Sequence, residues 1–274
     1  MSNYCYVNGE IKPADEGGIG ITDLALQRGY GVFDYGRTYK GKLFHFDDNI
    51  QRLRRSASAL HLKLPLSDQE IRGIAVQLIQ ESDLKTPAIR LILTGGYSNY
   101  SSPLEHPNFI IIAEELPTYP PDVYSYGANL ITVEYQRELP SVKSINYLNA
   151  IRLEPLKREE KAFDILYHSR HGITECPRNN FFLFFGDILV TPSEHVLHGI
   201  TRKQILQLAG NHFQVEERTL GLSELEGADE AFVTSTSKRV LPITRIDDRD
   251  VGDGAVGVRT RKIMKLFDAY TAGY

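Results

Sequence analysis

The sequence is poor in cysteine, with only Cys5 and Cys176 among 274 residues. Sparse cysteine is typical of proteins from reducing compartments, so we expect a cytoplasmic protein. No run of about 18 apolar residues is present, which is the length that a membrane-spanning helix needs. The first residues contain no basic stretch followed by an apolar one, so we expect neither a secretory leader nor a membrane partner.

Neither sign of charge is in large surplus. Lys and Arg number 31 and Asp and Glu number 35, which gives a formal net charge of −4. Nucleic-acid-binding domains usually carry a basic surplus, so no nucleic-acid partner is expected. Hydrophobic residues make up 42% and charged residues 24%, as in ordinary globular domains. At roughly 150 residues per domain, the length predicts one or two domains.

Two familiar kinds of binding motif are also missing. The glycine-rich patterns G-x-x-x-x-G-K-[ST] and G-x-G-x-x-G, which bind nucleotide phosphates, do not occur. The pairs His168/His171 and His195/His198 are the candidates for metal ligands. A catalytic zinc usually has three protein ligands, and no Cys or Glu completes either pair at ligand spacing. We therefore expect no metal site.

Local patterns predict a mixture of hairpins and amphipathic helices. Asn8-Gly9 between two β-prone runs predicts a hairpin, because both central positions of a type I′ turn need φ > 0. A second hairpin is expected over 37–44 and a helix from Asp47. The capping box Ser67 to Glu70 begins another helix. Further strands are expected at 88–94, 108–113, 129–133, 164–167, 181–185, 188–191, 231–233 and 240–243, and further helices at 147–161, from a Thr201 cap to near Gly210, and at 256–270.

A proline-rich stretch marks the domain boundary. Pro117, Pro120 and Pro121 fall within five residues, which favours an extended connection. We expect an N-terminal domain at 1–117, a linker at 118–123 and a larger domain at 124–274. Strands and helices mix without strict βαβ alternation, which indicates the α+β class.

Lys143 is the strongest candidate for covalent chemistry. It stands where an extended segment meets a predicted helix, among apolar and small neighbours that could free its amine for Schiff-base formation. Glu175 follows in a polar stretch just before a very apolar strand. A single lysine is usually a surface residue, so this candidate needs support from elsewhere in the chain.

Two segments are typical of phosphate-binding sites. In 198–202 a glycine and Thr201 stand at a helix start, where free N–H groups and the helix dipole favour an anion. In 234–237 a run of Thr and Ser follows a strand. Either segment alone is a weak signal, but with Lys143 and Arg52 they form a coherent site for a phosphate and an aldehyde.

These motifs, in this order, resemble the class IV (fold-type IV) aminotransferases that use pyridoxal 5′-phosphate. That group includes D-amino-acid and branched-chain aminotransferases and aminodeoxychorismate lyase. The resemblance extends over nearly the whole chain, and the segments that carry it are Gly31-Val32-Phe33-Asp34, 49–53, 143–148, 173–175, 199–202 and 232–236.

The resemblance implies a role for each matching residue. Lys143 would form the Schiff base and shuttle the substrate proton, and Glu175 would pair with the protonated pyridine nitrogen. Tyr147 would hydrogen-bond the cofactor's 3-oxygen. The phosphate would be bound by Arg52, Ile200, Thr201 and Thr236. The implied fold is a small N-terminal α+β domain and a larger C-terminal domain carrying Lys143, with the cofactor in the cleft and a homodimer that shares its active sites.

The chain departs from the family where the substrate would bind. Leu26 stands at a place that is often aromatic, and Arg28 where an apolar residue is common. The segment 95–100 lacks the Arg-x-His pair that D-amino-acid enzymes use for the carboxylate, and 176–178 replaces their small residues. Arg90 resembles an arginine of branched-chain enzymes near the substrate side chain.

We therefore expect Arg28 of the neighbouring subunit, Arg90 and Arg178 to bind the carboxylates of dicarboxylic substrates, with Ser237 in the same site. The favoured activity is transfer of an amino group between a D-amino acid (D-glutamate or D-alanine) and a 2-oxo acid such as 2-oxoglutarate. An L-branched-chain transaminase is supported by Tyr147 and Arg90, and aminodeoxychorismate lyase by the run 25–27. A non-catalytic pyridoxal-phosphate-binding protein is the fourth alternative, against which the intact Lys143 and Glu175 speak.

Overall fold

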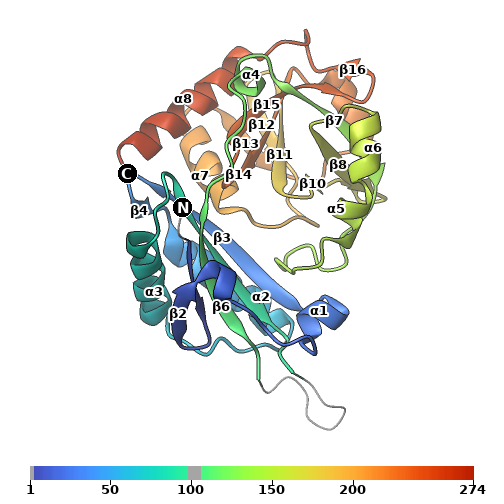
Figure 1. Cartoon of the computed structure of the whole chain (residues 1–274). Helices are drawn as coiled ribbons and strands as arrows, with labels where there is room; N and C mark the ends of the chain where they lie inside the picture. The colour runs from blue at the N-terminus through green and yellow to red at the C-terminus, as the bar shows by residue number, and fades with distance from the viewer. Residues whose placement is uncertain (1–2, 98–105) are drawn as a thin grey trace. The chain divides into compact units, whose positions relative to one another are not determined.

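The computed structural model describes residues 3–97 and 106–274, which fall into two compact units (Figure 1). The first unit consists of the chain up to Pro117, the stretch Val142–Asn146 and Tyr274. The second consists of Thr118–Ser141 and Tyr147–Gly273. Each unit has its own hydrophobic core.

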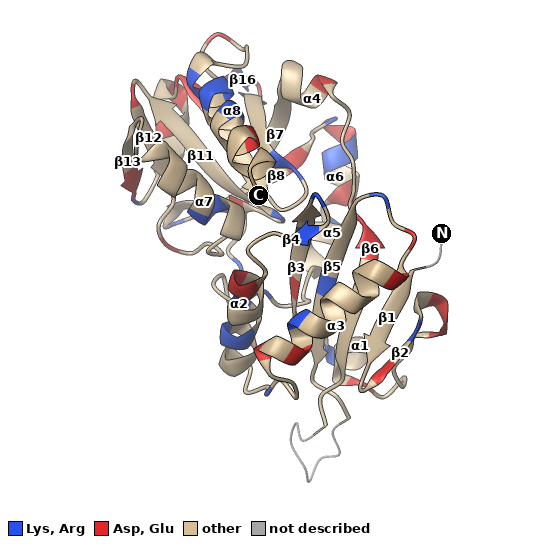
Figure 2. Cartoon of the chain, turned by 90° about the vertical axis from the view of Figure 1, so that its left-hand side faces the viewer, with Lys and Arg blue, Asp and Glu red and all other residues tan. Residues whose placement is uncertain are grey.

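The described residues of the first unit form a six-stranded antiparallel sheet, in the strand order β2-β1-β6-β5-β3-β4, with three α-helices and a short 3₁₀ helix (Ala14–Glu16). Its elements are β1 (Tyr4–Val7), β2 (Glu10–Pro13), α1 (Leu24–Arg28), β3 (Gly31–Tyr39), β4 (Lys42–Leu43), α2 (Phe46–Ala59), α3 (Asp68–Glu81), β5 (Pro87–Thr94) and β6 (Phe109–Glu115). Helix α2 packs on β3, and α3 packs across β1, β5 and β6 (Figure 2).

Both hairpins and both long helices of this unit are confirmed. The turns Asn8-Gly9 and Lys40-Gly41 have positive φ at both central residues, as the type I′ turn requires. The Ser67 hydroxyl accepts from the Glu70 N–H, and the Glu70 carboxylate accepts from the Ser67 N–H, so the capping box is complete.

Strand β3 separates two faces of the sheet. Its even-numbered residues from Val32 to Thr38 are buried, whereas Phe33, Tyr35, Arg37 and Tyr39 on the other face are half-buried. Gly36 allows α2 to lie close on the buried face, because a Cβ there would come within 3.1 Å of the Phe46 ring. The half-buried face carries several of the predicted functional residues.

The stretch Val142–Asn146 makes its contacts in the first unit, although we expected Lys143 in the C-terminal domain. The Phe33 N–H donates to the Lys143 carbonyl (2.9 Å), and the Ile145 N–H donates to the Gly31 carbonyl (3.1 Å). The Lys143 N–H donates to Ser56 Oγ at 3.1 Å. Local sequence patterns could not predict these hydrogen bonds between 143–145 and β3, because the partners lie about a hundred residues apart in the chain.

The second unit is built on a mixed sheet with the central strand order β13-β12-β11-β14-β15-β7-β8-β9. Its elements are α4 (Asp122–Ser125), β7 (Ala128–Glu134), α5 (Leu148–Arg152), α6 (Glu154–Glu159), β8 (Asp164–Ser169), β9 (Gly172–Ile173), β10 (Glu175–Cys176), β11 (Asn179–Phe185), β12 (Ile188–Thr191), α7 (Ile200–Ala209), β13 (Gln214–Glu217), a 3₁₀ helix (Leu222–Gly227), β14 (Glu230–Ser235), β15 (Arg239–Ile246), β16 (Arg249–Asp250) and α8 (Val258–Ala272). Helices α7 and α8 contact each other and β14.

Two expectations for helices of this unit were wrong. The helix predicted over 147–161 is divided at Leu153 into α5 and α6, because Pro155 in the first turn of α6 has no N–H to donate to the preceding turn. Helix α7 begins one residue before Thr201, with Gly199 as its N-cap. The mixed α+β architecture itself agrees with the predicted class.

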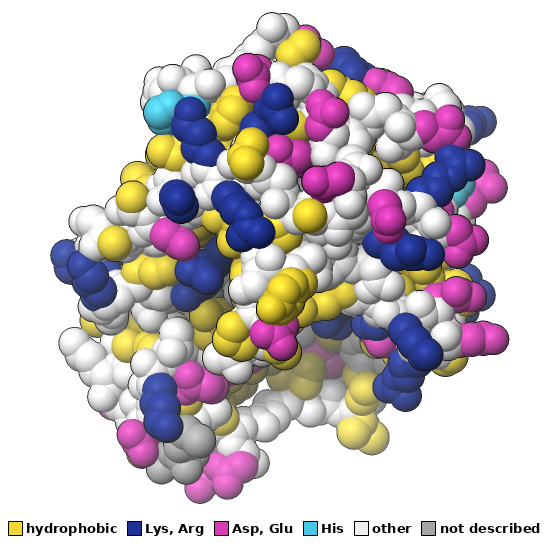
Figure 3. Space-filling view, turned by 90° about the horizontal axis from the view of Figure 1, so that it is seen from above, with side chains coloured by type: hydrophobic (Ala, Val, Ile, Leu, Met, Phe, Trp, Pro, Cys, Tyr) yellow, Lys and Arg dark blue, Asp and Glu magenta, His cyan; other side chains and the backbone are white. Residues whose placement is uncertain are grey.

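The surface seen in Figure 3 carries basic and acidic side chains interspersed, not gathered by sign. None of the helices formed by the described residues has the length and apolar character of a membrane span.

Candidate active site

The predicted site residues divide between the two units. The first unit contains Arg28, Arg52, Arg90 and Lys143, and the second contains Tyr147, Glu175, Arg178, Ile200, Thr201, Thr236 and Ser237.

In the first unit, Lys143 lies against an aromatic face. Its Nζ is 4.5 Å from the centre of the Phe33 ring, and Phe33 belongs to the half-buried face of β3. The backbone bonds between 143–145 and the start of β3 fix the main chain on both sides of the lysine. The geometry therefore holds a primary amine at a defined place over an apolar surface.

Arg52 is fixed by a buried carboxylate that sequence reasoning did not single out. Its Nε and Nη2 donate to the two carboxylate oxygens of Asp34, both at 2.8 Å, and Asn49 Nδ2 donates to Asp34 Oδ1 at 2.7 Å. Asn49 and Arg52 are three residues apart on α2, so they share the face that meets β3. The family segments 31–34 and 49–53 therefore contact each other through Asp34, Asn49 and Arg52. The two hydrogen bonds from Arg52 to Asp34 fix the plane of the guanidinium.

Arg90 lies on the same sheet face as Phe33. Its guanidinium is 4.8 Å from the centre of the Tyr35 ring and 5.8 Å from that of Phe33. Glu114 on the neighbouring strand β6 accepts two hydrogen bonds from it, at 3.1 Å from Nε and 2.5 Å from Nη2. Lys143 and Arg90 therefore contact the same phenyl ring.

Arg28 ends the short helix α1 and is exposed. The helix is anchored by the buried Asp23, which accepts from the Ala25 N–H (2.6 Å), from Thr94 Oγ1 (2.7 Å) and from Asn108 Nδ2 (2.5 Å). Leu26 of the same helix is 68% exposed. An anchored helix that presents an arginine and an apolar side chain outward suits contact with another protein surface.

In the second unit, Glu175 is buried among donors. Arg137 Nη1 donates to its Oε1 at 3.0 Å, while the Leu197 N–H and Asn180 Nδ2 donate to its Oε2 at 3.0 and 3.2 Å. Donors on both oxygens suit a carboxylate anion. Arg137 has no motif of its own, and sequence reasoning missed it.

Asn180 connects Glu175 to the start of α7. Besides Glu175, its side-chain amide donates to the Leu197 carbonyl at 2.7 Å. Its Oδ1 lies so close to Gly199 that a Cβ there would be 2.1 Å away. The glycine of this motif is therefore needed for packing against Asn180, and one side chain touches both candidate binding groups.

The first residues of α7 offer backbone donors. The opening N–H groups of any α-helix have no acceptor within the helix, and no side chain of the described residues caps α7. Thr201 lies in the first turn and is buried. Thr236 and Ser237 stand in the turn between β14 and β15.

That turn is held from inside by Lys238. Its buried Nζ donates to Asp164 Oδ2 (3.1 Å) and to Asn179 Oδ1 (3.0 Å). Asn179 directly follows Arg178, whose guanidinium lies 5.7 Å from the centre of the Tyr147 ring. The same buried lysine thus braces the turn at 236–238 and the segment at Arg178.

Cys176 follows Glu175 and is fully enclosed. Burial, and secondarily the nearby Asp164 carboxylate, raises the pKa of its thiol well above the ordinary value. The thiol is therefore neutral at physiological pH and serves as a packing group. Neither Cys5 nor Cys176 forms a disulfide.

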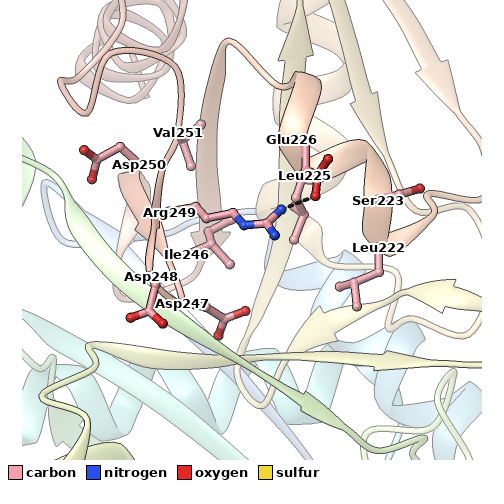
Figure 4. A pocket seen from close by; sticks show the side chains of 10 residues that line it. All are labelled: Leu222, Ser223, Leu225, Glu226, Ile246, Asp247, Asp248, Arg249, Asp250 and Val251. Atoms are coloured by element: carbon pink, nitrogen blue, oxygen red, sulfur yellow. Dashed lines mark hydrogen bonds and ion pairs between the residues drawn. The ribbon is translucent and has the colours of Figure 1, made fainter.

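Other features of the structure involve none of the predicted site residues directly. His171 and His195 stack with ring centres 4.4 Å apart, but the described residues contain no group of three or more metal-ligating side chains. A pocket of about 410 Å³ lies between the 3₁₀ helix and the β15–β16 turn, where Arg249 reaches Glu226 (Figure 4). Its lining includes none of the predicted site residues. The segment 95–100, whose sequence lacks the Arg-x-His pair, is described only up to residue 97, so residues 98–100 lie outside the described residues.

Comparison with known proteins identifies the family. Residues 31–246 match the family described as amino-transferase class IV. The chain belongs to the class IV aminotransferases. Aminotransferases of this class use pyridoxal 5′-phosphate, so the chain is a pyridoxal-phosphate-dependent enzyme.

Individual relatives support the same assignment. A D-alanine aminotransferase of Listeria monocytogenes is 30% identical over 95% of this chain and 93% of its own. The branched-chain amino acid aminotransferase of Escherichia coli has a TM-score of 0.93 at 25% identity, covering 100% of this chain and 96% of that one. Another branched-chain amino acid aminotransferase, solved with pyridoxamine 5′-phosphate, has a TM-score of 0.91 at 22% identity and covers 100% and 95%.

The residues of the aminotransferase fit this cofactor chemically. A helix start without a side-chain cap suits a phosphate, and the buried Thr234 Oγ1 beside the 236–238 turn has no hydrogen-bond partner among the described residues. Among the predicted site residues, Glu175 is a buried carboxylate and Lys143 a primary amine, the residue types that a pyridine nitrogen and an aldehyde require.

Proposed function

We propose that this enzyme is a D-amino-acid transaminase that exchanges the amino group between a D-amino acid, such as D-glutamate or D-alanine, and a 2-oxo acid such as 2-oxoglutarate. The observation that carries the proposal is the placement of Arg90 and Lys143 on one phenyl ring. This placement puts a carboxylate-binding cation beside the candidate catalytic amine. The relatives named D-alanine aminotransferase support the choice of D-substrates.

When bound, pyridoxal phosphate supplies an aldehyde for the amino group and a ring that withdraws electrons from the substrate Cα. Lys143 would hold the cofactor at that aldehyde, then take the proton from Cα and deliver it to C4′. Its fixed main chain limits the arc over which the amine moves, which favours transfer between two neighbouring carbons.

The remaining residues bind and orient. Arg52, with its plane set by Asp34, the N–H groups of Ile200 and Thr201, and Thr236 would hold the phosphate. Glu175 would keep the ring nitrogen protonated, with Arg137 and Asn180 positioning its carboxylate. Tyr147 would hydrogen-bond the 3-oxygen.

The substrate carboxylates would be bound by arginines. We assign Arg178 and Ser237, with Arg28 of the partner subunit, to the α-carboxylate side, and Arg90 to the distal carboxylate. The assignment to Arg28 requires a homodimer, which the exposed Ile21 before the anchored helix α1 and the exposed Leu26 within it support.

An L-branched-chain transaminase is the second candidate, favoured by the structural likeness to the Escherichia coli enzyme. Half-reactions of the cofactor-loaded enzyme with D-alanine, D-glutamate, L-leucine and aminodeoxychorismate distinguish the activities. We expect loss of the cofactor's visible absorbance with the two D-amino acids. A response to L-leucine alone would overturn the D-specificity, and pyruvate release from aminodeoxychorismate would show a lyase.

Replacing Lys143 tests the central role. Lys143→Ala should abolish the Schiff-base absorbance that borohydride bleaches, and reduce half-reaction rates by several orders of magnitude, because covalent catalysis and proton transfer are both lost. Lys63→Ala, at an exposed lysine of the same unit, is the matched control and should behave as the wild type. Persistent absorbance in the Lys143 variant would refute the assignment and show that another amine forms the Schiff base.

A further inference from the structure

The ion pair between Arg90 and Glu114 lies on the half-buried face of the first unit's sheet. Arg90 pairs across the strands with Ile112, so Glu114 is its diagonal neighbour on the same face. Both carboxylate oxygens of Glu114 accept from the guanidinium. The side chains are 34% and 26% exposed, so a small anion in solution can reach the pair.

The surroundings of this pair connect it with the candidate catalytic amine. The guanidinium stacks on Tyr35 and reaches Phe33, and Lys143 Nζ lies over the same Phe33 ring. A substrate side chain that extends from Lys143 along Phe33 would thus meet Arg90 together with Glu114.

A transaminase binds two kinds of substrate in one pocket, and here their side chains differ in charge. An arginine without a counterion suits a distal carboxylate. Beside the methyl group of alanine or pyruvate it leaves an uncompensated cation, which is unfavourable where the bound substrate displaces water from the arginine. A carboxylate already paired with the arginine removes this cost, because the pair is neutral.

We propose that Glu114 is a specificity-determining residue that stands in for the distal carboxylate of the substrate. It pairs with Arg90 while a substrate with an uncharged side chain is bound. A dicarboxylic substrate competes with it for the guanidinium. The inference rests on the proposed function, since Arg90 must face the substrate.

Glu114→Gln tests the proposal, because it keeps the size and an acceptor but removes the competing charge. We expect kcat/KM for D-glutamate and 2-oxoglutarate to rise about three- to tenfold and that for D-alanine and pyruvate to fall by a similar factor, as suits a partly exposed ion pair. Succinate, an unreactive dicarboxylate, should inhibit the variant more strongly than the wild type.

Glu115→Gln is the matched control. It makes the same change of charge one residue along the strand, but the Glu115 carboxylate accepts from the N–H groups of Lys85 and Thr86. We expect its kinetics to match the wild type. Glu114→Asp, which keeps the charge but withdraws it from Arg90, should shift kcat/KM in the same directions as Glu114→Gln, to a smaller extent.

Opposite shifts for the two substrate classes support the proposal, because a merely structural effect would lower both. Equal shifts in one direction, unchanged kinetics, or the same result in Glu115→Gln would overturn it. If the wild-type holoenzyme turned over neither D-alanine nor D-glutamate, the proposed function would fail instead. In that case, succinate inhibition of the half-reaction with whichever amino acid the enzyme accepts, compared between the wild type and Glu114→Gln, would still test the role of Glu114.

Discussion

Four buried carboxylates of the described residues each face a basic side chain: Asp34 with Arg52, Glu175 with Arg137, Asp164 with Lys238, and Glu230 with Arg259. A buried charge without a partner is strongly destabilising, so the pairs occur together. The family resemblance implied roles for Arg52 and Glu175 but did not pair them with these partners. The partner of a buried charge comes from another element, and the sequence holds no local trace of that contact.

At the same scale, Tyr167 predicts how stability depends on alkaline pH. The ring is buried with Ile131, Leu153 and Ile165, and burial raises the pKa of its hydroxyl from 10.0 to about 12. Below pH 10 folded and unfolded chains both hold the proton, so this contribution is complete. As the pH rises from 10 towards 12, only the unfolded chain ionises, and the free energy of unfolding falls.

Urea unfolding at several pH values above 9 measures this effect. The stability of Tyr167→Phe should decline less steeply with pH than that of the wild type, because the variant has lost the group that titrates differently in the two states. Parallel slopes would show that the folded protein ionises Tyr167 as readily as the unfolded chain does.

At the scale of elements, local rules predicted what local contacts decide. The Asn8-Gly9 turn and the Ser67 capping box each depend on residues within a few positions, and both were predicted correctly. The start of α7 was displaced by one residue because Gly199, not Thr201, occupies the cap. Glycine is needed at 199 because Asn180 of strand β11 approaches it closely.

Gly199→Ala should therefore weaken cofactor binding more than it weakens the fold. The added Cβ would come 2.1 Å from Asn180 Oδ1, so Asn180 must shift, and with it the contacts to Glu175 and Leu197. We expect the Kd for pyridoxal phosphate to rise about tenfold or more, equivalent to the loss of one to two hydrogen bonds. Absorbance titration of the apoenzyme measures it.

Gly73→Ala is the control, since Gly73 lies within α3 and a Cβ at this position would have nothing within 4 Å. Alanine there should leave cofactor affinity unchanged and stabilise the helix by about 0.5–1 kcal/mol. Equal affinity of the Gly199 variant and the wild type would show that Asn180 accommodates the methyl group without disturbing its partners.

At the scale of the whole molecule, the candidate residues are shared between units that each have a separate core. The proline-rich stretch predicted a division near 117. The return of Val142–Asn146 to the first unit could not be predicted, because it depends on backbone bonds to β3 and not on side-chain pattern. Lys143 and Arg52 consequently belong to one unit and Glu175 to the other, so the proposed roles require both units to serve one cofactor molecule.

The proposed homodimer with shared sites predicts complementation between two defective variants. In a heterodimer of Lys143→Ala and Arg28→Ala, one site carries both defects. The other combines an intact Lys143 with an intact Arg28 of the partner subunit. Random exchange of subunits makes half of the molecules heterodimers, so about a quarter of all sites should regain wild-type kinetics.

Mixing the two purified variants under mild dissociating conditions, followed by assay with D-glutamate, measures the recovery. The Arg28 variant alone should show a raised KM and the Lys143 variant no turnover, so a low-KM component appears only if subunits exchange and share sites. If Arg28 serves the site of its own subunit, no combination of the two chains yields an intact site. The mixture then gives only the Arg28 variant's kinetics, diluted by the inactive chain.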